Sequence, residues 1–134
     1  MTNQTSSCVL LADRHHGLRD SVRGVLELEF ESVFMVANKR SLVEGVGRLK
    51  PAIVVLDLSL AGGDLRGLLT RITERSPGSK VLMLTVHDEV TVAKAAVAAG
   101  AAAVVLKSKL ATDLLLAVDA LRSGNQYISP ELAT

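Results

Sequence analysis

Sulfur and aromatic side chains are scarce in this chain of 134 residues. It has one cysteine, Cys8, no tryptophan, and as aromatic residues only Phe30, Phe34 and Tyr127. A single cysteine excludes an internal disulfide and a zinc site built from several cysteines. Because aromatic residues are so few, the core must be built from Val, Leu, Ile and Ala.

Strong net charge and long apolar runs are missing too. The net charge is +1, with acids and bases mixed along the chain, which argues against direct binding to nucleic acid or to an anionic membrane. No apolar run has membrane-spanning length. The polar residues 1–7 lack the regions of a signal peptide and are expected to be flexible. We therefore expect a cytoplasmic protein with one folded domain.

Five short apolar runs alternate with stretches that have helical spacing. Such alternation predicts a parallel sheet with helices on both faces. The runs are rich in β-branched residues and have little polar alternation, as expected for strands covered on both sides. They lie at residues 9–12, 32–37, 53–56, 81–84 and 103–106. Helices are expected after each run, the first over residues 17–30 and the fourth over residues 88–99.

Helix-capping residues punctuate this pattern. Ser41 and Glu44 have the spacing of a capping box at the start of the second helix. Asp64 is expected to cap the third helix and Thr112 the last. Gly100 is a favourable end for the fourth helix.

Four residues with reactive or charged side chains follow four of the apolar runs. They are Asp13, Asp57, Thr85 and Lys107. The carboxyl ends of parallel strands meet at one edge, where ligands bind in open α/β sheets. Each residue also has an ordinary interpretation: Asp57 as a turn or cap residue, Thr85 as a β-branched strand end, and Lys107 as a solvated lysine.

In this order and spacing, the motifs VLLAD, IVVLDLSL, KVLMLTVHDE and GAAAVVLKS resemble the receiver domain of bacterial two-component response regulators. LTVHDE and SGNQYISPELA are most similar to the NarL/FixJ subfamily, whose members continue into a DNA-binding helix-turn-helix domain. The resemblance implies a flavodoxin-like (βα)5 three-layer sandwich. Its parallel sheet has five strands in the order 2-1-3-4-5.

The resemblance also implies roles for the four strand-end residues. Asp57 would accept a phosphoryl group from a phosphohistidine of a sensor histidine kinase, while Lys107 and Thr85 would contact that group. Mg²⁺ would be held by Asp13, Asp57 and the backbone carbonyl of Ser59. The chain would then not be an enzyme, beyond catalysing its own phosphotransfer and dephosphorylation.

Arg14 departs from the family, which has a second acid at this position. Exchanging a carboxylate for a guanidinium is expected to leave Mg²⁺ binding weak or absent. In one interpretation Arg14 turns into solvent and water replaces the lost ligand. In the other, Arg14 pairs with Asp57 or Asp13 and partly substitutes for the metal, since guanidinium suits carboxylate and phosphate geometry.

Other positions depart as well. Val104 stands where the family has its switch aromatic, so the usual conformational readout is in question. Ala61 replaces a usual proline and Leu65 a usual glycine. The adjacent histidines His15 and His16 are interpreted as solvated or helix-capping, rather than as metal ligands.

Three functions are compared. The first is the receiver domain of a transcriptional regulator, with a phosphoryl acceptor and weakened Mg²⁺ dependence. The second is a phosphorylation-independent pseudo-receiver that acts as a dimerisation or interaction module. The third, an enzyme on the same fold, is disfavoured because DRHHG lacks phosphate-binding glycines and no acid stands two residues after Asp57.

The expected domain covers residues 8–124. Residues 125–134 are a tail or the start of a linker to an output domain outside this chain, and Tyr127 and Ile128 are expected to pack back on the body. Direct contact with DNA is expected only through such an output domain. A homodimer is expected through the exposed surface of the last helices and strand, because residues 93–103 are rich in alanine.

Overall fold

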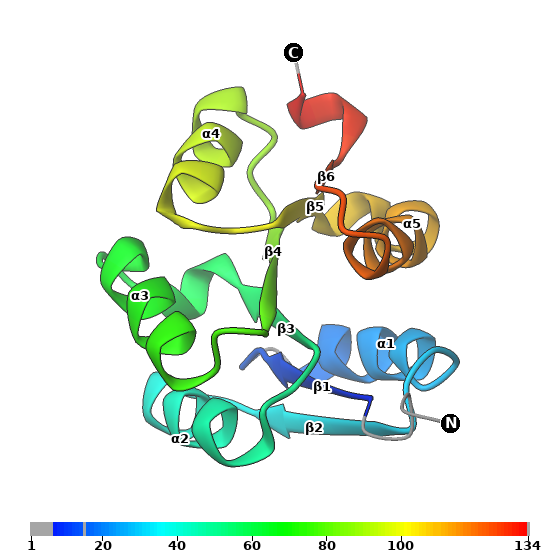
Figure 1. Cartoon of the computed structure of the whole chain (residues 1–134). Coiled ribbons are helices and arrows are strands. Elements are labelled where there is room, and N and C mark those ends of the chain that lie inside the picture. The colour runs from blue at the N-terminus through cyan, green and yellow to red at the C-terminus, as the bar shows by residue number, and fades with distance from the viewer. Residues whose placement is uncertain (1–6, 15, 134) are drawn as a thin grey trace.

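The computed structural model describes residues 7–14 and 16–133, with the side chains of residues 16–19 excepted. Most of the N-terminal stretch predicted to be flexible lies outside the described residues, as do His15 and the side chain of His16. The described chain forms a parallel sheet of strand order β2-β1-β3-β4-β5-β6 (Figure 1). The strands are β1 (Cys8–Ala12), β2 (Ser32–Val36), β3 (Ile53–Asp57), β4 (Lys80–Thr85), β5 (Ala103–Leu106) and β6 (Tyr127–Ile128).

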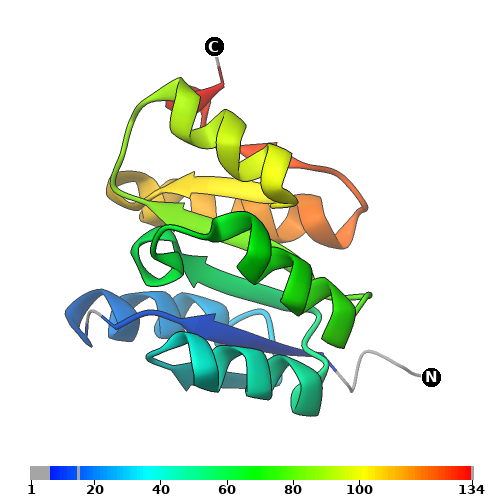
Figure 2. The same cartoon turned by 90° about the vertical axis from the view of Figure 1, so that its left-hand side faces the viewer.

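Helices cover both faces of the sheet. Figure 2 shows α2 (Lys39–Leu49), α3 (Leu65–Arg75) and α4 (Val90–Ala99) in front of the strands. On the other face lie α1 (His16–Leu26) and α5 (Leu110–Arg122). The buried side chains accordingly form two apolar clusters, one on each side of the sheet. This arrangement confirms the predicted flavodoxin-like three-layer sandwich.

The buried strands explain why the sequence pattern predicts this sheet. Every residue of β1, β3 and β5 is buried, because helices cover both faces of these strands. β2 lies at one edge, and its pattern is correspondingly more exposed. Each fully buried Leu, Val or Ile contributes about 1.5–3 kcal/mol relative to an exposed one, so an aliphatic core suffices.

The prediction of five strands is incomplete, because the sheet has a sixth. β6 runs parallel to β5, with Tyr127 opposite Ala103 and Ile128 opposite Val104. The expectation that Tyr127 and Ile128 pack back on the body is thereby confirmed. A strand of two residues is too short to give a periodic pattern, so only pairing with β5 reveals it.

Two predicted helix caps are wrong and one is confirmed. Asn38 caps α2, and its side chain accepts a hydrogen bond from the Ser41 amide at 2.8 Å. Thr112 lies inside the first turn of α5, where its hydroxyl donates to the Lys109 carbonyl at 3.2 Å. Asp64 caps α3 as predicted. Asn and Ser are about equally good cap residues, so the sequence alone does not decide which of them starts α2.

Two helices are shorter than predicted. α1 ends at Leu26, because the chain turns there and Phe30 packs into the core beneath it. The Phe30 amide still donates to the Leu26 carbonyl at 3.0 Å, which closes the turn. α4 begins at Val90 and ends, as predicted, before Gly100, whose φ of 119° suits glycine.

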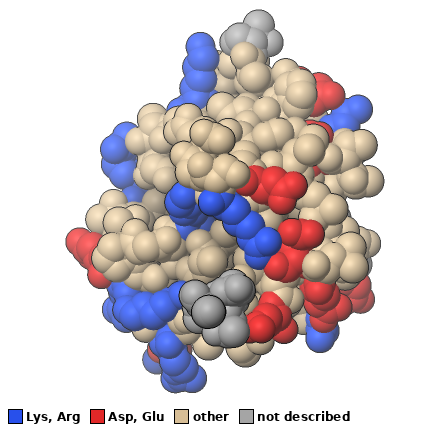
Figure 3. Space-filling view, turned by 45° about the vertical axis from the view of Figure 1, so that its right-hand side comes forward, with Lys and Arg blue, Asp and Glu red and all other residues tan. Residues whose placement is uncertain are grey.

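The molecular surface carries both signs of charge. On the face drawn in Figure 3, lysine and arginine lie close to aspartate and glutamate. Among the exposed ion pairs of the chain, Arg122 pairs with Glu29 at 3.2 Å, and its guanidinium stacks over the Phe30 ring. Among the described residues, no helix has both the length and the apolar character needed to cross a membrane.

Candidate functional site

The structure brings the four strand-end residues together at the carboxyl edge of the sheet. Asp57 and Thr85 end β3 and β4, while Asp13 and Lys107 directly follow β1 and β5. The Lys107 Nζ atom lies 3.0 Å from Asp57 Oδ1 and 3.9 Å from Asp13 Oδ2. One ammonium group therefore lies between two carboxylates that are 44 positions apart in the sequence.

These side chains are almost completely buried. Asp13 is 0% exposed, Asp57 2% and Thr85 1%, and the Lys107 side chain is 10% exposed. Burying a charged group is costly unless it is paired. A hollow of about 370 Å³, lined in part by Asp57, Thr85, Lys107 and His87, gives access to the pair. The site thus combines a buried ion pair with an opening large enough for a small ligand.

The surroundings of Asp57 favour its ionised form. The Ser59 hydroxyl donates to Asp57 Oδ2 at 2.7 Å, and the Ser59 amide donates to Oδ1 at 3.3 Å. Burial by itself raises the pKa of Asp57, but the Ser59 hydroxyl and the Lys107 ammonium outweigh burial and hold the pKa below its usual range. Asp57 is therefore a carboxylate at neutral pH, as a nucleophile must be.

Thr85 is the last residue of β4 and lines the same hollow. Its Oγ1 atom accepts a hydrogen bond from the His87 amide at 3.0 Å, which fixes the turn after the strand. The backbone thus holds the Thr85 hydroxyl at the rim of the site. A hydroxyl at this position can donate to an oxygen of a bound anion.

Arg14 contacts the loop that follows Asp57. Its Nη2 atom donates to the Ser59 carbonyl oxygen at 3.2 Å. This contact was not foreseen from the sequence, which suggested either solvent or a carboxylate as the partner of Arg14. The Ser59 carbonyl oxygen is the third ligand expected for Mg²⁺. In this structure that oxygen already accepts a hydrogen bond from a cationic side chain.

Lys39 is a further cation that the sequence did not single out. Its Nζ donates to the Ala61 carbonyl at 3.2 Å, on the same loop that Arg14 contacts. Lys39 begins α2, and no local pattern relates it to Asp57, 18 positions later. His87 was likewise missed as a lining residue. Only the folded structure shows that Lys39 contacts the loop after Asp57 and that His87 lines the same hollow as Asp57.

The residues at this edge fit a divalent cation poorly. Mg²⁺ prefers several oxygen ligands in near-octahedral geometry. Here Lys107 and Arg14 balance the formal charge of Asp13 and Asp57, and Arg14 donates to the Ser59 carbonyl. Within residues 7–14 and 16–133, no group of three or more His, Cys, Asp and Glu side chains is placed to hold a metal ion.

Val104 is 1% exposed in the middle of β5. It pairs with Met83 of β4 on one side and with Ile128 of β6 on the other. A β-branched side chain has restricted χ1 rotation, and packed in this way it fills the core. The position therefore offers no aromatic ring whose rotation could report events at Asp57.

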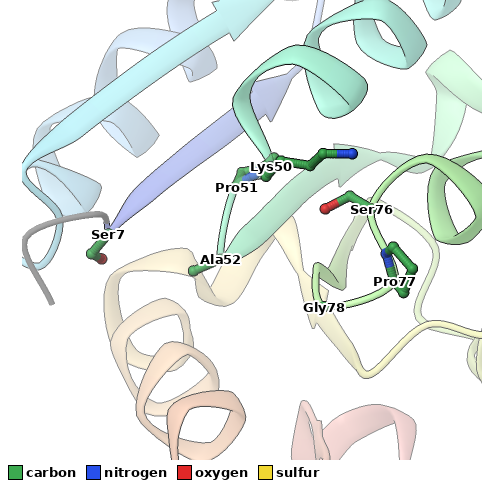
Figure 4. Close-up of a pocket in the computed structure, with 7 residues that line it drawn as sticks. All are labelled: Ser7, Lys50, Pro51, Ala52, Ser76, Pro77 and Gly78. Carbon is green, nitrogen blue, oxygen red and sulfur yellow. The ribbon is translucent and has the colours of Figure 1, made fainter. Parts of the chain in front are cut away.

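A second hollow, of about 520 Å³, lies where loops enter the opposite edge of the sheet (Figure 4). Its polar groups tie these loops together. The Ser76 and Ser79 hydroxyls share a hydrogen bond of 2.7 Å, Ser79 donates to the Pro51 carbonyl, and Lys50 donates to the Arg75 carbonyl. Although this hollow is larger, its chemistry is structural, and the Asp57 edge remains the candidate site.

Comparison with known protein families gives one match over most of the chain. The model described as the response regulator receiver domain matches residues 9–119. Among curated proteins, the chain is 27% identical over 132 residues to the transcriptional regulatory protein DegU of Brevibacillus brevis, covering 97% of this chain and 56% of that protein. It is 29% identical over 130 residues to the oxygen regulatory protein NreC of Staphylococcus haemolyticus, covering 94% and 59%.

Solved structures give the same result. A two-component response regulator of the LuxR family from Aurantimonas sp. superposes with a TM-score of 0.84 and 26% identity, covering 95% of this chain and 92% of that one. The non-phosphorylated receiver domain of the stress response regulator RcsB from Escherichia coli gives a TM-score of 0.77 and 26% identity, with 92% and 98% coverage. The chain spans less than two thirds of the length of the curated relatives named above.

Proposed function

The chain belongs to the response regulator receiver domain family, and on that premise we propose that Asp57 accepts a phosphoryl group from a sensor histidine kinase. The observation that carries this proposal is the ionised, buried Asp57 carboxylate 3.0 Å from the Lys107 ammonium. An Asp57 oxygen attacks the phosphorus of a phosphohistidine and forms an acyl phosphate. The phosphorus–nitrogen bond breaks, and its electron pair stays on the imidazole.

Lys107 and Thr85 assist this transfer. The Lys107 ammonium offsets the negative charge that the phosphoryl oxygens bring to Asp57. The Thr85 hydroxyl, at the end of the neighbouring strand, donates a hydrogen bond to one of these oxygens. Both groups are fixed before the phosphoryl group arrives, so little reorganisation accompanies the reaction.

The transfer has a weakened dependence on Mg²⁺ in this proposal. In the pocket that the family resemblance implies, Mg²⁺ offsets a surplus of carboxylates. Here the positive charges of Arg14 and Lys107 already balance the negative charges of Asp13 and Asp57. Binding of a divalent cation is therefore less favourable electrostatically. Arg14 is held on the Ser59 carbonyl, two positions after Asp57. In this proposal its guanidinium supplies a second cation when a phosphoryl group adds further negative charge.

Incubation with acetyl phosphate tests the function directly. Intact-mass spectrometry is expected to show one added phosphoryl group on the natural chain and none on Asp57→Asn. The adduct should also form, more slowly, when Mg²⁺ is replaced by a chelator. Asp88→Asn, at an exposed residue before α4, is the matched control and should behave as the natural chain does. An adduct that persists in Asp57→Asn would refute the assignment.

The pseudo-receiver remains the second candidate, because Arg14 on the Ser59 carbonyl and Val104 buried in β5 both depart from the family. It predicts no adduct in any condition while the fold and self-association persist. The same mass measurement, with and without Mg²⁺, therefore separates the two functions.

We further propose that the natural protein is a transcriptional regulator in which an output domain follows this chain. Two relatives are named as regulatory proteins, and the chain covers 56% and 59% of their length. With a net charge of +1, the receiver domain itself should not bind DNA. An electrophoretic mobility assay of this chain with duplex DNA should show no shift. A salt-sensitive shift would contradict this division of roles.

We also propose a weak homodimer. All four residues of β5 are buried, so the surface available there belongs to α4, α5 and β6 rather than to the fifth strand. On it, Leu116 of α5 is 54% exposed. Light scattering at rising protein concentration, with and without acetyl phosphate, should show a mass above that of the monomer. A monomeric mass throughout would contradict the proposal.

A further inference from the structure

Ser129 lies at the junction of β5, α5 and the C-terminal segment, and its side chain is fully buried. Its hydroxyl accepts a hydrogen bond from the Leu106 amide at 3.0 Å and donates one to Asp113 Oδ2 at 2.7 Å. Its own amide donates to the Val104 carbonyl at 2.9 Å. One small residue thus connects three parts of the fold that are distant in sequence.

The Ser129 hydroxyl completes the pairing between β5 and β6. In a continuous parallel ladder, the Leu106 amide would donate to the Ser129 carbonyl. That carbonyl instead accepts the Leu132 amide at 2.8 Å, because the chain turns at Pro130. The hydroxyl takes the place of the missing carbonyl and provides a partner for the last amide of β5.

Asp113 anchors this hydroxyl from the other side. It is a carboxylate only 6% exposed in the first turn of α5, and the Thr112 hydroxyl also donates to it at 3.1 Å. Burial, followed by the charge of Asp113, raises the pKa of the Tyr127 hydroxyl, which borders the same carboxylate. The cluster of Thr112, Asp113, Tyr127 and Ser129 therefore fixes the orientation of the Ser129 hydroxyl.

We propose that Ser129 is a positioning residue for Lys107, and that it couples the C-terminal segment to the Asp57 pocket. Leu106, whose amide it holds, directly precedes Lys107 in the chain. Displacing Ser129 therefore loosens the backbone that places the Lys107 ammonium on Asp57. By thermodynamic reciprocity, charge added at Asp57 changes how firmly residues 127–133 are held. The functional part of this inference rests on the proposed phosphoryl transfer.

The test compares Ser129→Ala with Ser129→Thr, which keeps the hydroxyl, and with Ser123→Ala as control. Ser123 is an exposed serine at the end of α5. Ser129→Ala should lower the rate of acetyl phosphate adduct formation about tenfold, Ser129→Thr should restore much of that rate, and Ser123→Ala should leave it unchanged. If Ser129→Ala only loosened the fold, it would lower the melting temperature, and Ser129→Thr would not restore the rate of adduct formation.

A second readout is independent of phosphorylation. Lysine acylation followed by peptide mass spectrometry should show Lys107 reacting several-fold faster in Ser129→Ala than in the natural chain. Lys80, which donates to the Leu121 carbonyl at 2.8 Å, serves as the internal reference and should not change. Amide hydrogen exchange should accelerate at Leu106 and over residues 127–133.

Asp113→Asn is a milder second variant for the case in which Ser129→Ala does not fold. It keeps the side-chain shape but removes the charge that orients the Ser129 hydroxyl, so it should change the same readouts in the same direction. Unchanged Lys107 labelling and Leu106 exchange in the folded variants would overturn the inference. Absence of any adduct on the natural chain would instead refute the proposed function, and the labelling results would still decide the inference.

Discussion

The guanidinium of Arg14 donates to the backbone carbonyl of Ser59 across 3.2 Å. This contact joins the loop after β1 to the loop after Asp57. It places a positive charge beside the carbonyl oxygen that, by the family resemblance, would bind the metal. The charge of the pocket is thereby balanced by side chains of the chain itself.

Arg14→Asp should restore Mg²⁺ binding. The substitution changes the local charge by two units, supplies an oxygen ligand and releases the Ser59 carbonyl. Without Mg²⁺ the variant should melt at a lower temperature than the natural chain, because three carboxylates then repel one another. Mg²⁺ should reverse this loss, by about 2.7 kcal/mol at a hundred times its dissociation constant. Thermal melts with and without millimolar Mg²⁺ measure both effects.

Arg71→Asp is the control for Arg14→Asp, since it makes the same charge change at an exposed position of α3. Its melting temperature should respond to Mg²⁺ as little as that of the natural chain. If the natural chain already gains as much stability from Mg²⁺ as Arg14→Asp does, Arg14 has no influence on metal binding.

Lys107→Ala should both destabilise the chain and slow phosphorylation. It leaves Asp13 and Asp57 without the ammonium between them, and removing one partner of a buried ion pair costs about 3 kcal/mol. Loss of a group that stabilises transition-state charge lowers the rate by about 100-fold. Urea unfolding and the acetyl phosphate reaction measure the two losses.

Lys109→Ala is the matched control for Lys107→Ala. Lys109 pairs with Glu131 at 3.6 Å, but both side chains are nearly half exposed. Exposed pairs contribute about 0–1 kcal/mol, so stability and rate should change little. Equal effects of the two lysine substitutions would argue against a special role of Lys107.

The stability of the natural chain should fall in acid faster than that of Asp57→Asn. The pKa of Asp57 is lower in the folded chain than its ordinary value, so ionisation of this group stabilises the folded state. That contribution is fully present above the unfolded-state pKa of about 3.9 and is lost as pH falls through the folded-state value. Urea unfolding from pH 6 down to about pH 2 measures it, with the loss expected below about pH 4. Parallel pH profiles for the two chains would contradict the lowered pKa.

Asn38→Ala should destabilise the chain by about 1 kcal/mol, because it removes the side chain that caps α2. Ser41→Ala should have little effect, since Ser41 contributes its backbone amide to this cap. Chemical denaturation of both variants distinguishes the cap seen in the structure from the capping box that the sequence suggested. A larger loss for Ser41→Ala would reverse the assignment.

The sequence predicts the caps less well than the strands for a local reason. Both Asn38 and Ser41 are suitable cap residues, and the difference in energy between them is small. The choice depends on how the loop after β2 enters the helix. The apolar runs leave no such choice, because burial on both faces of a strand requires several consecutive apolar residues.

By itself, the sequence determined the βα alternation, the aliphatic core and the strand ends that carry Asp13, Asp57, Thr85 and Lys107. These features follow from local pattern, since each apolar run and the residue after it are contiguous in the chain. Only the tertiary structure decided the contacts of Arg14 with Ser59 and of Ser129 with Leu106 and Asp113. These contacts join segments that are far apart in sequence. Such hydrogen bonds form only after the strands have aligned in the sheet.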